Sequence, residues 1–369
     1  MKKYKKLKTS GFDRFAITER DLLKNLTEES FTFRKQALGD SNDKAVFAEN
    51  VNEYQLFSIV EADRFHANAK AIFGKESASY VQQKIEDTVK LGNRRKLAKA
   101  PNIEVIKQLR DSFPNFGEAL DAFEGACALS HLSAQGYIQI SPLLLLGDPG
   151  IGKTAFVQAL SKLISVNFTR VDIGTSSSSA ILAGLSLTWG SGRCGEIFNL
   201  LTESEFMNPI VMLDEIDKAV GNHVAPIEPI LLSLLESESS SSFKDEAIQL
   251  KLDASKIIWI ATANHKEQIS EALLSRFTIV EIKQPDKQQA KKIVSNIYRN
   301  IKATNTWGKN FENELDDEVV LKLSELTPRV ASKLLQLAFG KAAINHRNKI
   351  LAEDIPCVEN KKSYNLGFV

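Results

Sequence analysis

The stretch Pro142-Leu-Leu-Leu-Leu-Gly-Asp-Pro-Gly-Ile-Gly-Lys-Thr154 decides the fold of this chain. Its four consecutive leucines predict a strand that is buried on both faces, as in a parallel sheet. The strand runs directly into residues 147–154, which fit the phosphate-binding pattern G-x-x-x-x-G-K-[ST]. Residues 155–164 are predicted to form the helix that follows.

This order of strand, glycine-rich loop and helix suits the binding of a nucleoside triphosphate. Glycines let backbone N–H groups curl around phosphate oxygens, and the helix N-terminus adds roughly half a positive charge. Lys153 is expected to reach the β- and γ-phosphates, and the Thr154 hydroxyl is expected to hold Mg²⁺. A glycine turn that matches by chance is the alternative, and the flanking strand and helix disfavour it. The predicted nucleotide contacts are Gly147, Asp148, Pro149, Gly150, Ile151, Gly152, Lys153, Thr154 and Ala155.

The composition is that of an ordinary globular protein, with 369 residues, 43% hydrophobic and 25% charged. The net charge is only +1, but residues 1–100 carry an excess of lysine and arginine. Runs of basic residues are usually solvated surface; the alternative is a contact for nucleic acid or an acidic partner. Three scattered cysteines and five scattered histidines predict neither a disulfide framework nor a zinc site. Without an apolar run of membrane-spanning length or a secretory signal, a cytoplasmic protein without a membrane partner is expected.

The pattern along the chain predicts three regions. Residues 1–100 are expected to be a mostly helical N-terminal region, and Pro101 and residues 112–117 indicate a linker. Residues 101–285 alternate strands and helices, which predicts a doubly wound α/β domain with a parallel sheet. Residues 286–369 are predicted to be a small all-helical domain with a short tail. The further strands are expected at 167–173, 209–213, 257–262 and 277–282, and the helices at 77–90, 118–132, 193–203, 227–236, 287–301, 317–326 and 329–343.

A second apolar strand ends in two carboxylates, Asp214 and Glu215. Ligands bind at the carboxyl edge of a parallel sheet, so both side chains are expected near the phosphate loop. Asp214 is predicted to organise Mg²⁺ through its water shell, and Glu215 to orient and deprotonate the attacking water. An apolar strand that ends in Asp-Glu is often purely structural, but its position after a phosphate loop favours the functional role.

Three further polar residues stand where a hydrolytic site would need them. Asn264 follows a buried strand and could bind the γ-phosphate or the water, although it could also cap the turn. Arg276 precedes the last strand and could reach a neighbouring subunit's nucleotide, or form a surface salt bridge. Arg329 opens a helix, where a cation is costly unless a phosphate or a glutamate lies nearby.

Together these elements resemble the AAA+ ATPase superfamily over about residues 100–357, and most closely the ATPase module of Lon-type proteins. The resemblance implies that Asp214 and Glu215 form the second nucleotide motif, that Asn264 is the first sensor, that Arg276 is the arginine finger and that Arg329 is the second sensor. The stretches that carry the similarity to Lon are residues 213–219, 229–236, 242–245, 252–257, 261–264 and 273–276.

The resemblance also implies partners. An arginine finger acts across a subunit interface, so a homo-oligomer, expected to be a hexameric ring, and the cofactors ATP and Mg²⁺ follow from it. Trp189 falls where Lon proteins keep an aromatic pore loop, so a protein substrate is expected to be threaded past it, although packing in a core or interface is the alternative. Residues 1–100 do not match the substrate-binding domain of Lon and could bind a separate partner. Lon proteases continue into a peptidase domain, whereas few residues follow Pro356 here, so no intrinsic peptidase is expected.

Three functions stay open from the sequence. The first is an ATP-hydrolysing ring that remodels or unfolds protein substrates, a Lon-like ATPase without the protease. The second is an ATP-driven nucleic-acid motor or a defence or mobile-element ATPase, which the basic N-terminal region favours and the lack of a nucleic-acid-binding motif disfavours. The third is a nucleotide-switched scaffold, against which the pair Asp214 and Glu215 counts.

Overall fold

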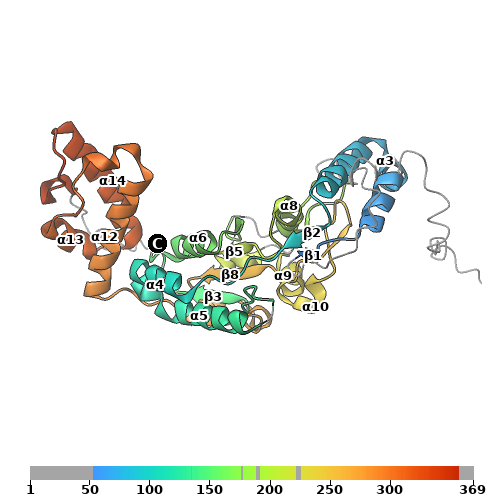
Figure 1. The fold of residues 1–369 in the computed structure, drawn as a ribbon, viewed down its shortest axis with the longest axis horizontal. Helices are drawn as coiled ribbons and strands as arrows, with labels where there is room; N and C mark the ends of the chain where they lie inside the picture. The colour runs from blue at the N-terminus through green and yellow to red at the C-terminus, as the bar shows by residue number, and fades with distance from the viewer. Residues whose placement is uncertain (1–52, 134, 176–177, 188–191, 222–225, 357–369) are drawn as a thin grey trace, which may run out of the picture. The chain divides into compact units, whose positions relative to one another are not determined.

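The computed structural model describes residues 53–133, 135–175, 178–187, 192–221 and 226–356 of the chain (Figure 1). Contacts divide this part of the chain into two units. Residues 59–92 belong to the first unit, and residues 53–58 and 93–356 belong to the second. The functional division of the chain at residues 100 and 285 stays a prediction.

The first unit consists of the helical segment α3 (Ile59–Lys90), which includes the helix expected at 77–90. Gly74 interrupts the segment with φ of 75° and ψ of 171°, a conformation that glycine adopts readily. His66 Nε2 and Glu86 Oε1 lie 3.0 Å apart across this interruption, and Gln82 donates to the carbonyl oxygen of His66. The two helical arms therefore pack against each other as a hairpin.

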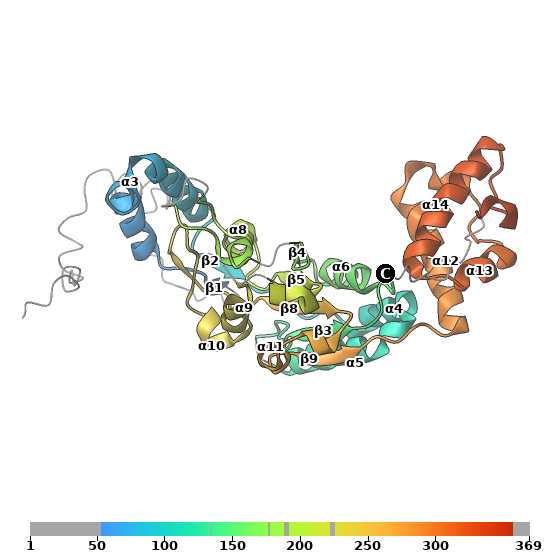
Figure 2. The same cartoon turned by 180° about the vertical axis from the view of Figure 1, so that it is seen from behind.

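Five parallel strands form the central sheet of the second unit. In chain order they are β3 (Leu143–Leu146), β4 (Phe168–Asp172), β5 (Ile210–Asp214), β8 (Ile258–Ala263) and β9 (Thr278–Glu281). Hydrogen bonds place them in the order β4-β5-β8-β3-β9, which Figure 2 shows from top to bottom. Every neighbouring pair is parallel. The predicted α/β fold with a parallel sheet is confirmed.

One face of this sheet carries a large apolar core. The elements that cover it are α4 (Ile103–Ser112), η1 (Pro114–Phe116), α5 (Gly117–Leu132) and α6 (Lys153–Ile164). Leu143 and Leu145 of β3 belong to this core, whereas the alternate residue Leu144 is fully buried on the opposite face. Burial on both faces explains why the strand consists of four leucines.

Shorter elements connect the strands. They are α7 (Ala180–Ala183), α8 (Glu196–Glu203), η2 (Ile216–Gly221), α9 (Glu228–Leu235), α10 (Ser237–Ser240), β6 (Phe243–Lys244), β7 (Lys251–Leu252), η3 (Lys266–Gln268) and α11 (Glu271–Leu274). The helix expected at 193–203 begins only at Glu196. Leu185 and Arg193 exchange two backbone hydrogen bonds of 2.8 and 3.1 Å, and this pairing holds residue 193 in an extended conformation.

The structure differs from the sequence pattern at the entry to this unit. β1 (Glu53–Gln55) pairs antiparallel with β2 (Arg94–Lys96), so residues 53–58 and 93–100 group with the α/β unit. Of the linker expected at Pro101 and residues 112–117, residues 114–116 form η1, and α4 occupies most of the stretch between its two parts. Asn102 caps α4 by accepting a hydrogen bond from the Glu104 amide, a local signal that the sequence analysis missed.

The C-terminal helices have a core of their own. They are α12 (Lys287–Thr304), η4 (Thr306–Asn310), α13 (Asp317–Ser324), α14 (Pro328–Ile344) and η5 (Ala352–Asp354). Tyr298 and Phe339 stack with ring centroids 5.2 Å apart in this core. Gln289 donates to the carbonyl oxygen of Pro114 at 3.1 Å and Asn296 to that of Asp111 at 2.8 Å, so α12 adjoins η1 and α4. The predicted helical domain therefore borders the nucleotide side of the sheet.

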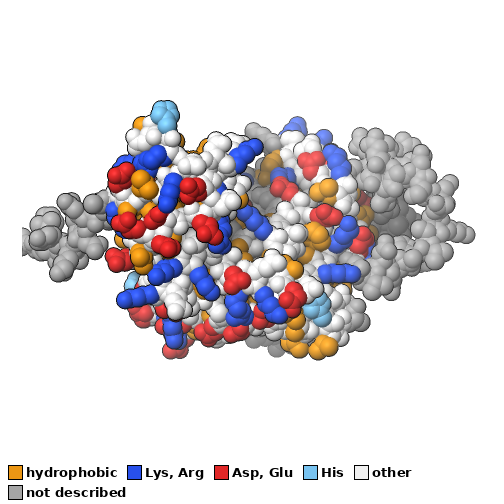
Figure 3. Space-filling view, turned by 60° about the vertical axis from the view of Figure 1, so that its left-hand side comes forward, with side chains coloured by type: hydrophobic (Ala, Val, Ile, Leu, Met, Phe, Trp, Pro, Cys, Tyr) orange, Lys and Arg blue, Asp and Glu red, His pale blue; other side chains and the backbone are white. Residues whose placement is uncertain are grey.

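Charged side chains of both signs are interspersed over the face drawn in Figure 3, and they do not gather into a patch of one sign there. Among the residues that the structure describes, no helix combines the length and the apolar character needed to cross a bilayer.

Candidate functional site

The loop after β3 has the backbone conformation of a phosphate-binding loop. Gly150 and Gly152 have φ of 81° and 107°, which a residue with a Cβ atom rarely adopts, and α6 begins directly after Gly152. Gly147 lies so close to the last strand that a Cβ atom would be 2.5 Å from the carbonyl oxygen of Ile282. The glycines are therefore required by the backbone itself.

A cavity of about 650 Å³ lies beside this loop. Its walls come from the loop and α6, from the carboxyl ends of β5 and β8, and from α12 and α14 of the helical domain. The volume is in the range of cavities that hold a small molecule or cofactor. Of the residues predicted from the sequence, it is lined by Pro149, Gly150, Ile151, Gly152, Lys153, Thr154, Ala155, Asp214, Glu215, Asn264 and Arg329.

Lys153 is the buried cation of this cavity, with only 9% of its surface exposed. Its ammonium group donates to the carbonyl oxygens of Gly147 and Asp148, and to Asn264 Oδ1 at 2.9 Å. Burial lowers the pKa of Lys153, while the nearby carboxylate of Asp214 opposes that shift. The side chain of Asn264 therefore connects the end of β8 to the phosphate loop.

Asp214 is held on both sides by residues of neighbouring strands. One carboxylate oxygen accepts a hydrogen bond from the Thr262 hydroxyl. The other lies 2.6 Å from Arg170 Nη2 of β4, and Arg170 also lies 3.7 Å from Asp172. The β4–β5 register places Asp172 directly opposite Asp214, so the arginine balances two adjacent carboxylates.

Glu215 has an unusual backbone, with φ of 57°. Its N–H donates to the Thr262 hydroxyl at 3.2 Å, so the same hydroxyl orients both Asp214 and Glu215. The Glu215 carboxylate forms an ion pair with Lys218. It also lies against Gly174, where a Cβ atom would be 2.4 Å from Glu215 Oε2. Strain at this one residue directs its side chain along the cavity edge.

The turn at Asn264 is fixed by a buried carboxylate and not by the Asn264 side chain. Asp217 is 4% exposed, and its Oδ2 accepts hydrogen bonds from the backbone N–H groups of Asn264 and His265 at 3.1 and 3.2 Å. The capping role considered for Asn264 thus belongs to Asp217, which leaves the Asn264 amide free to face the cavity.

The two predicted arginines lie in different places. Arg329 lines the cavity, and its backbone N–H approaches the carbonyl oxygen of Gly150 at 3.4 Å. It forms no ion pair with any residue that the structure describes, so the nearby glutamate considered from the sequence is not seen there. Arg276 is outside this cavity, 39% exposed, and its Nη2 lies 3.7 Å from Glu236 Oε1. Trp189 lies outside the described residues.

No role was predicted from the sequence for Arg170, Thr262 or Asp217. Each is a polar residue inside or just beyond an apolar strand, and that contrast was a usable signal for Thr262 and Asp217. Arg170 carried no local signal, because its role depends on β4 lying beside β5.

The residues present fit a nucleotide with Mg²⁺. The Thr154 hydroxyl and the Asp214 carboxylate offer oxygen ligands, which Mg²⁺ prefers, on the same cavity as Lys153. Both carboxylate oxygens of Asp214 already have partners within the protein, so this residue would hold a Mg²⁺ ion through the ion's bound water and not by direct coordination.

Comparisons with known proteins agree with this geometry. Residues 143–285 match the family model described as ATPase family associated with various cellular activities (AAA). The Lon protease of Mycoplasma mobile is 33% identical over 140 residues, which is 38% of this chain and 17% of that protein. The peroxisomal Lon protease homolog 2 of Caenorhabditis briggsae is 33% identical over 193 residues, which is 52% of this chain and 24% of that protein.

A solved structure of the S. cerevisiae Hsp104:casein complex in an extended conformation shares the fold, with a TM-score of 0.53 at 16% identity. The structural match covers 79% of this chain and 61% of the Hsp104 complex chain. The predicted resemblance is confirmed: residues 143–285 are similar to the AAA ATPase family, and the chain is similar to Lon proteases over 38–52% of its length. The match spans 17% and 24% of the two Lon relatives' own lengths.

Proposed function

We propose that this chain binds ATP with Mg²⁺, hydrolyses it, and uses the hydrolysis as a ring-shaped assembly to remodel protein substrates. The observation that carries this proposal is the convergence of Lys153, Asp214, Glu215, Asn264 and Arg329 on one cavity. These residues come from the phosphate loop, two strand ends and the helical domain, and hydrolysis of a phosphoanhydride needs their chemistry together.

The phosphate loop supplies binding. Its backbone N–H groups and the start of α6 favour anionic oxygens, and the Lys153 ammonium can exchange a carbonyl partner for a phosphate oxygen. Thr154 and Asp214 would hold Mg²⁺, which supplies neutralisation of phosphate charge when bound.

Glu215 supplies the base. Its carboxylate lines the cavity, where it can accept a proton from the attacking water. Asn264 bonds to Lys153 and is therefore within reach of the same terminal phosphate. Arg329 approaches that phosphate from the helical domain, where its charge has no partner among the described residues.

Arg276 supports the ring. It is outside the cavity of its own chain, so it can stabilise a transferring phosphoryl group only at the site of a neighbouring subunit. We propose an oligomeric ring on this basis, and six subunits because the resemblance to AAA+ proteins implies a hexamer.

The similarity to Lon supports a protein substrate. Contact of that substrate with Trp189, a partner bound to residues 1–100, and a cytoplasmic location stay predictions. A nucleic-acid substrate has no structural observation in its favour.

Two variants test the hydrolytic site. Glu215→Gln should retain ATP binding and lower turnover at least about a hundredfold, because it removes a general base. Lys153→Ala should weaken ATP binding itself. Normal turnover in Glu215→Gln would show that another group is the base.

A third variant tests the ring. Arg276→Ala should lower turnover about a thousandfold, and mixing it with Lys153→Ala should restore part of the activity, since each subunit then contributes the group that the other lacks. Full activity of Arg276→Ala, or a monomer by sedimentation in ATP, would contradict the assembly. Stimulation of turnover by an unfolded protein supports the substrate class, whereas stimulation by DNA that falls steeply with salt contradicts it.

A further inference from the structure

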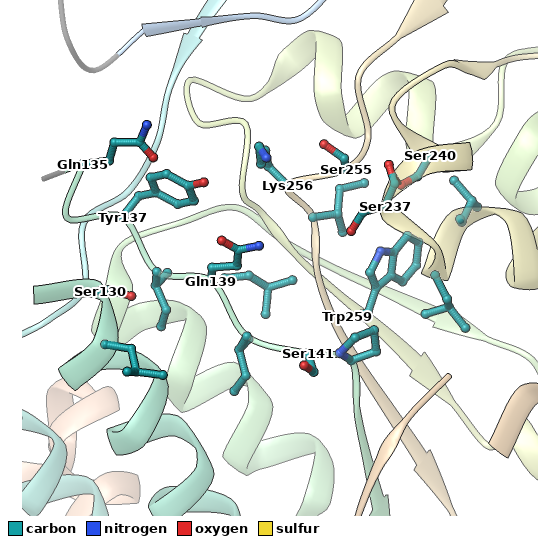
Figure 4. A pocket seen from close by; sticks show the side chains of 18 of the residues that line it. Ser130, Gln135, Tyr137, Gln139, Ser141, Ser237, Ser240, Ser255, Lys256 and Trp259 are labelled. Atoms are coloured by element: carbon teal, nitrogen blue, oxygen red, sulfur yellow. Dashed lines mark hydrogen bonds between the residues drawn. The ribbon is translucent and has the colours of Figure 1, made fainter. Parts of the chain in front are cut away.

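A second cavity, of about 470 Å³, lies at the opposite edge of the same sheet (Figure 4). It is lined at the amino ends of β3 and β8, by Pro142 and Trp259 among others, and by the segment that leads from α5 into β3. The phosphate loop and Asn264 stand at the carboxyl ends of these two strands. Neither the nucleotide site nor the proposed arginine finger uses this amino-edge cavity.

The charge of this amino-edge cavity is one-sided. Among the described residues that line it, Lys256 is the only charged one, and none is an aspartate or a glutamate. The Lys256 ammonium lies 5.9 Å from the centre of the Tyr137 ring and forms no ion pair with a described residue. The other polar lining side chains are serines, glutamines, a tyrosine and a tryptophan. Three of the serine hydroxyls already donate to backbone carbonyl oxygens (Ser130, Ser133 and Ser240), and the remaining side chains can donate hydrogen bonds to a ligand. A ligand with a carboxylate matches this set.

One wall of the cavity is backbone without main-chain partners. Residues 139–141 lie outside any helix or strand, and none of their N–H or C=O groups bonds to another backbone group of the described chain. Backbone hydrogen bonds resume on either side of this segment. The N–H of Ile138 donates to the carbonyl oxygen of Ala98, and the carbonyl oxygen of Pro142 accepts from the N–H of Thr278. An unpaired stretch of this kind is where an extended peptide can add its own backbone hydrogen bonds.

Trp259 provides a hydrogen-bond donor in the same space. The residue is 3% exposed, and its indole N–H has no hydrogen-bond partner among the described residues. Figure 4 shows Trp259 and Lys256 facing the same space as Gln139. The indole N–H is a donor only, and a peptide carbonyl or carboxylate would provide its acceptor.

We propose that the amino-edge cavity binds an extended, carboxylate-bearing peptide segment of a partner protein. The segment pairs its backbone with residues 139–141, places its carboxylate at Lys256 and accepts a hydrogen bond from Trp259. The volume fits a few residues of peptide. This site goes beyond the proposed ATPase activity and does not depend on it.

The position of the site connects it to both parts of the proposed machine. Glu236, the ion-pair partner of Arg276, stands between two lining residues, Leu235 and Ser237. Trp259 is in β8 and Asn264 directly follows that strand, roughly 17 Å away along an extended chain. A bound partner segment therefore contacts the residues on either side of Glu236 and the amino end of the strand that leads to Asn264.

A selection experiment tests the proposal on the full-length protein without nucleotide. A library of random short peptides is selected on the wild-type protein, with Lys256→Glu protein as the competing bait. We expect enrichment of peptides that contain Asp or Glu. Binding of an enriched peptide, measured by fluorescence anisotropy, should weaken about tenfold in Lys256→Glu. It should weaken about fivefold in Trp259→Phe, which keeps a smaller aromatic ring but loses the indole N–H. Lys251→Glu, an exposed lysine on β7, should leave the affinity unchanged.

Four results would overturn the proposal. The first is that no selected peptide prefers the wild type to Lys256→Glu, and the second is enrichment of peptides without a carboxylate. The third is displacement of the peptide by succinate at a concentration equal to the peptide's own Kd, because it would show that the peptide backbone contributes nothing to binding. The fourth is a change of assembly mass in Lys256→Glu with peptide affinity unchanged, which would make the cavity a contact between copies of this chain. Melting of each variant beside the wild type separates a lost site from a lost fold, and Lys256→Gln replaces Lys256→Glu if the latter unfolds.

Discussion

Replacing Thr262 with valine tests the polar network that joins the ends of β5 and β8. Thr262 is 1% exposed, and its hydroxyl donates to Asp214 and accepts from the Glu215 N–H at 3.2 Å. Valine has nearly the same shape, so the change removes both hydrogen bonds and leaves almost no cavity.

The magnitude follows from the two bonds. A hydrogen bond to a charged group contributes about 1.5–3 kcal/mol to stability, and a neutral one contributes about 1 kcal/mol. Arg170 still holds the other oxygen of Asp214 at 2.6 Å, which limits the cost of the unpaired carboxylate oxygen. We therefore expect Thr262→Val to lower the free energy of unfolding by about 3 kcal/mol.

The assay is urea denaturation followed by circular dichroism, with Thr262→Ser as the matched control. Serine keeps the hydroxyl and loses one buried methyl group, so its cost should be only about 1 kcal/mol. The argument fails if valine costs no more than serine, or if Thr262→Val unfolds at the same urea concentration as the wild type.

Three further changes have expected outcomes. Gly174→Ala should place a methyl group against the Glu215 carboxylate and displace it, so ATP turnover should fall at least about tenfold. Because the Glu215 side chain is flexible and can move aside, the melting temperature should hardly change. Gly308→Ala brings a Cβ atom within 2.1 Å of a backbone carbonyl oxygen of α12, so it should destabilise the helical domain by about 3 kcal/mol in urea denaturation. Gly340→Ala has open space around it inside α14, so the same assay should show that it stabilises the domain by about 0.5–1 kcal/mol. Burial raises the pKa of Asp245 from 3.8 to about 6, so the folded protein holds this proton more tightly than the unfolded chain does. The stability of the wild type relative to Asp245→Asn should therefore fall by about 3 kcal/mol in total as the pH rises from about 3 to about 7, and stay level above that.

Each of these has a contrary result. Unchanged turnover in Gly174→Ala would mean that Glu215 does not depend on its contact with that glycine. Equal stability of Gly308→Ala and Gly340→Ala would contradict the close approach of the backbone to α12. A carboxyl resonance of Asp245 that titrates near 4 by NMR would show that its backbone hydrogen bonds outweigh burial.

The strands of the sheet could be predicted because each carries its signal locally. The four leucines of β3 and the apolar residues of β8 are short buried runs next to turn residues. The pairing of β1 with β2 could not be predicted, since both strands are short and polar and a 32-residue helical segment separates them. Their pairing is determined by tertiary contacts that a local pattern does not contain.

The candidate site divides in the same way. Lys153, Asp214 and Asn264 belong to motifs whose spacing along the chain predicts a shared sheet edge. Arg170 meets Asp214 only because β4 takes the place beside β5, and nothing near residue 170 indicates that order. Motifs therefore identified the groups proposed to act on the nucleotide, and the structure was needed to find the groups that hold them.

The backbone of Glu215 has a consequence for how this protein can change. Its φ of 57° costs a residue with a side chain roughly 1–2 kcal/mol, whereas glycine or asparagine would adopt it more easily. Selection for heat resistance alone would therefore favour the loss of the very carboxylate that the proposed hydrolysis requires. A glutamate can persist at this position only while selection acts on activity, because the strain itself favours drift toward a more stable but inactive protein.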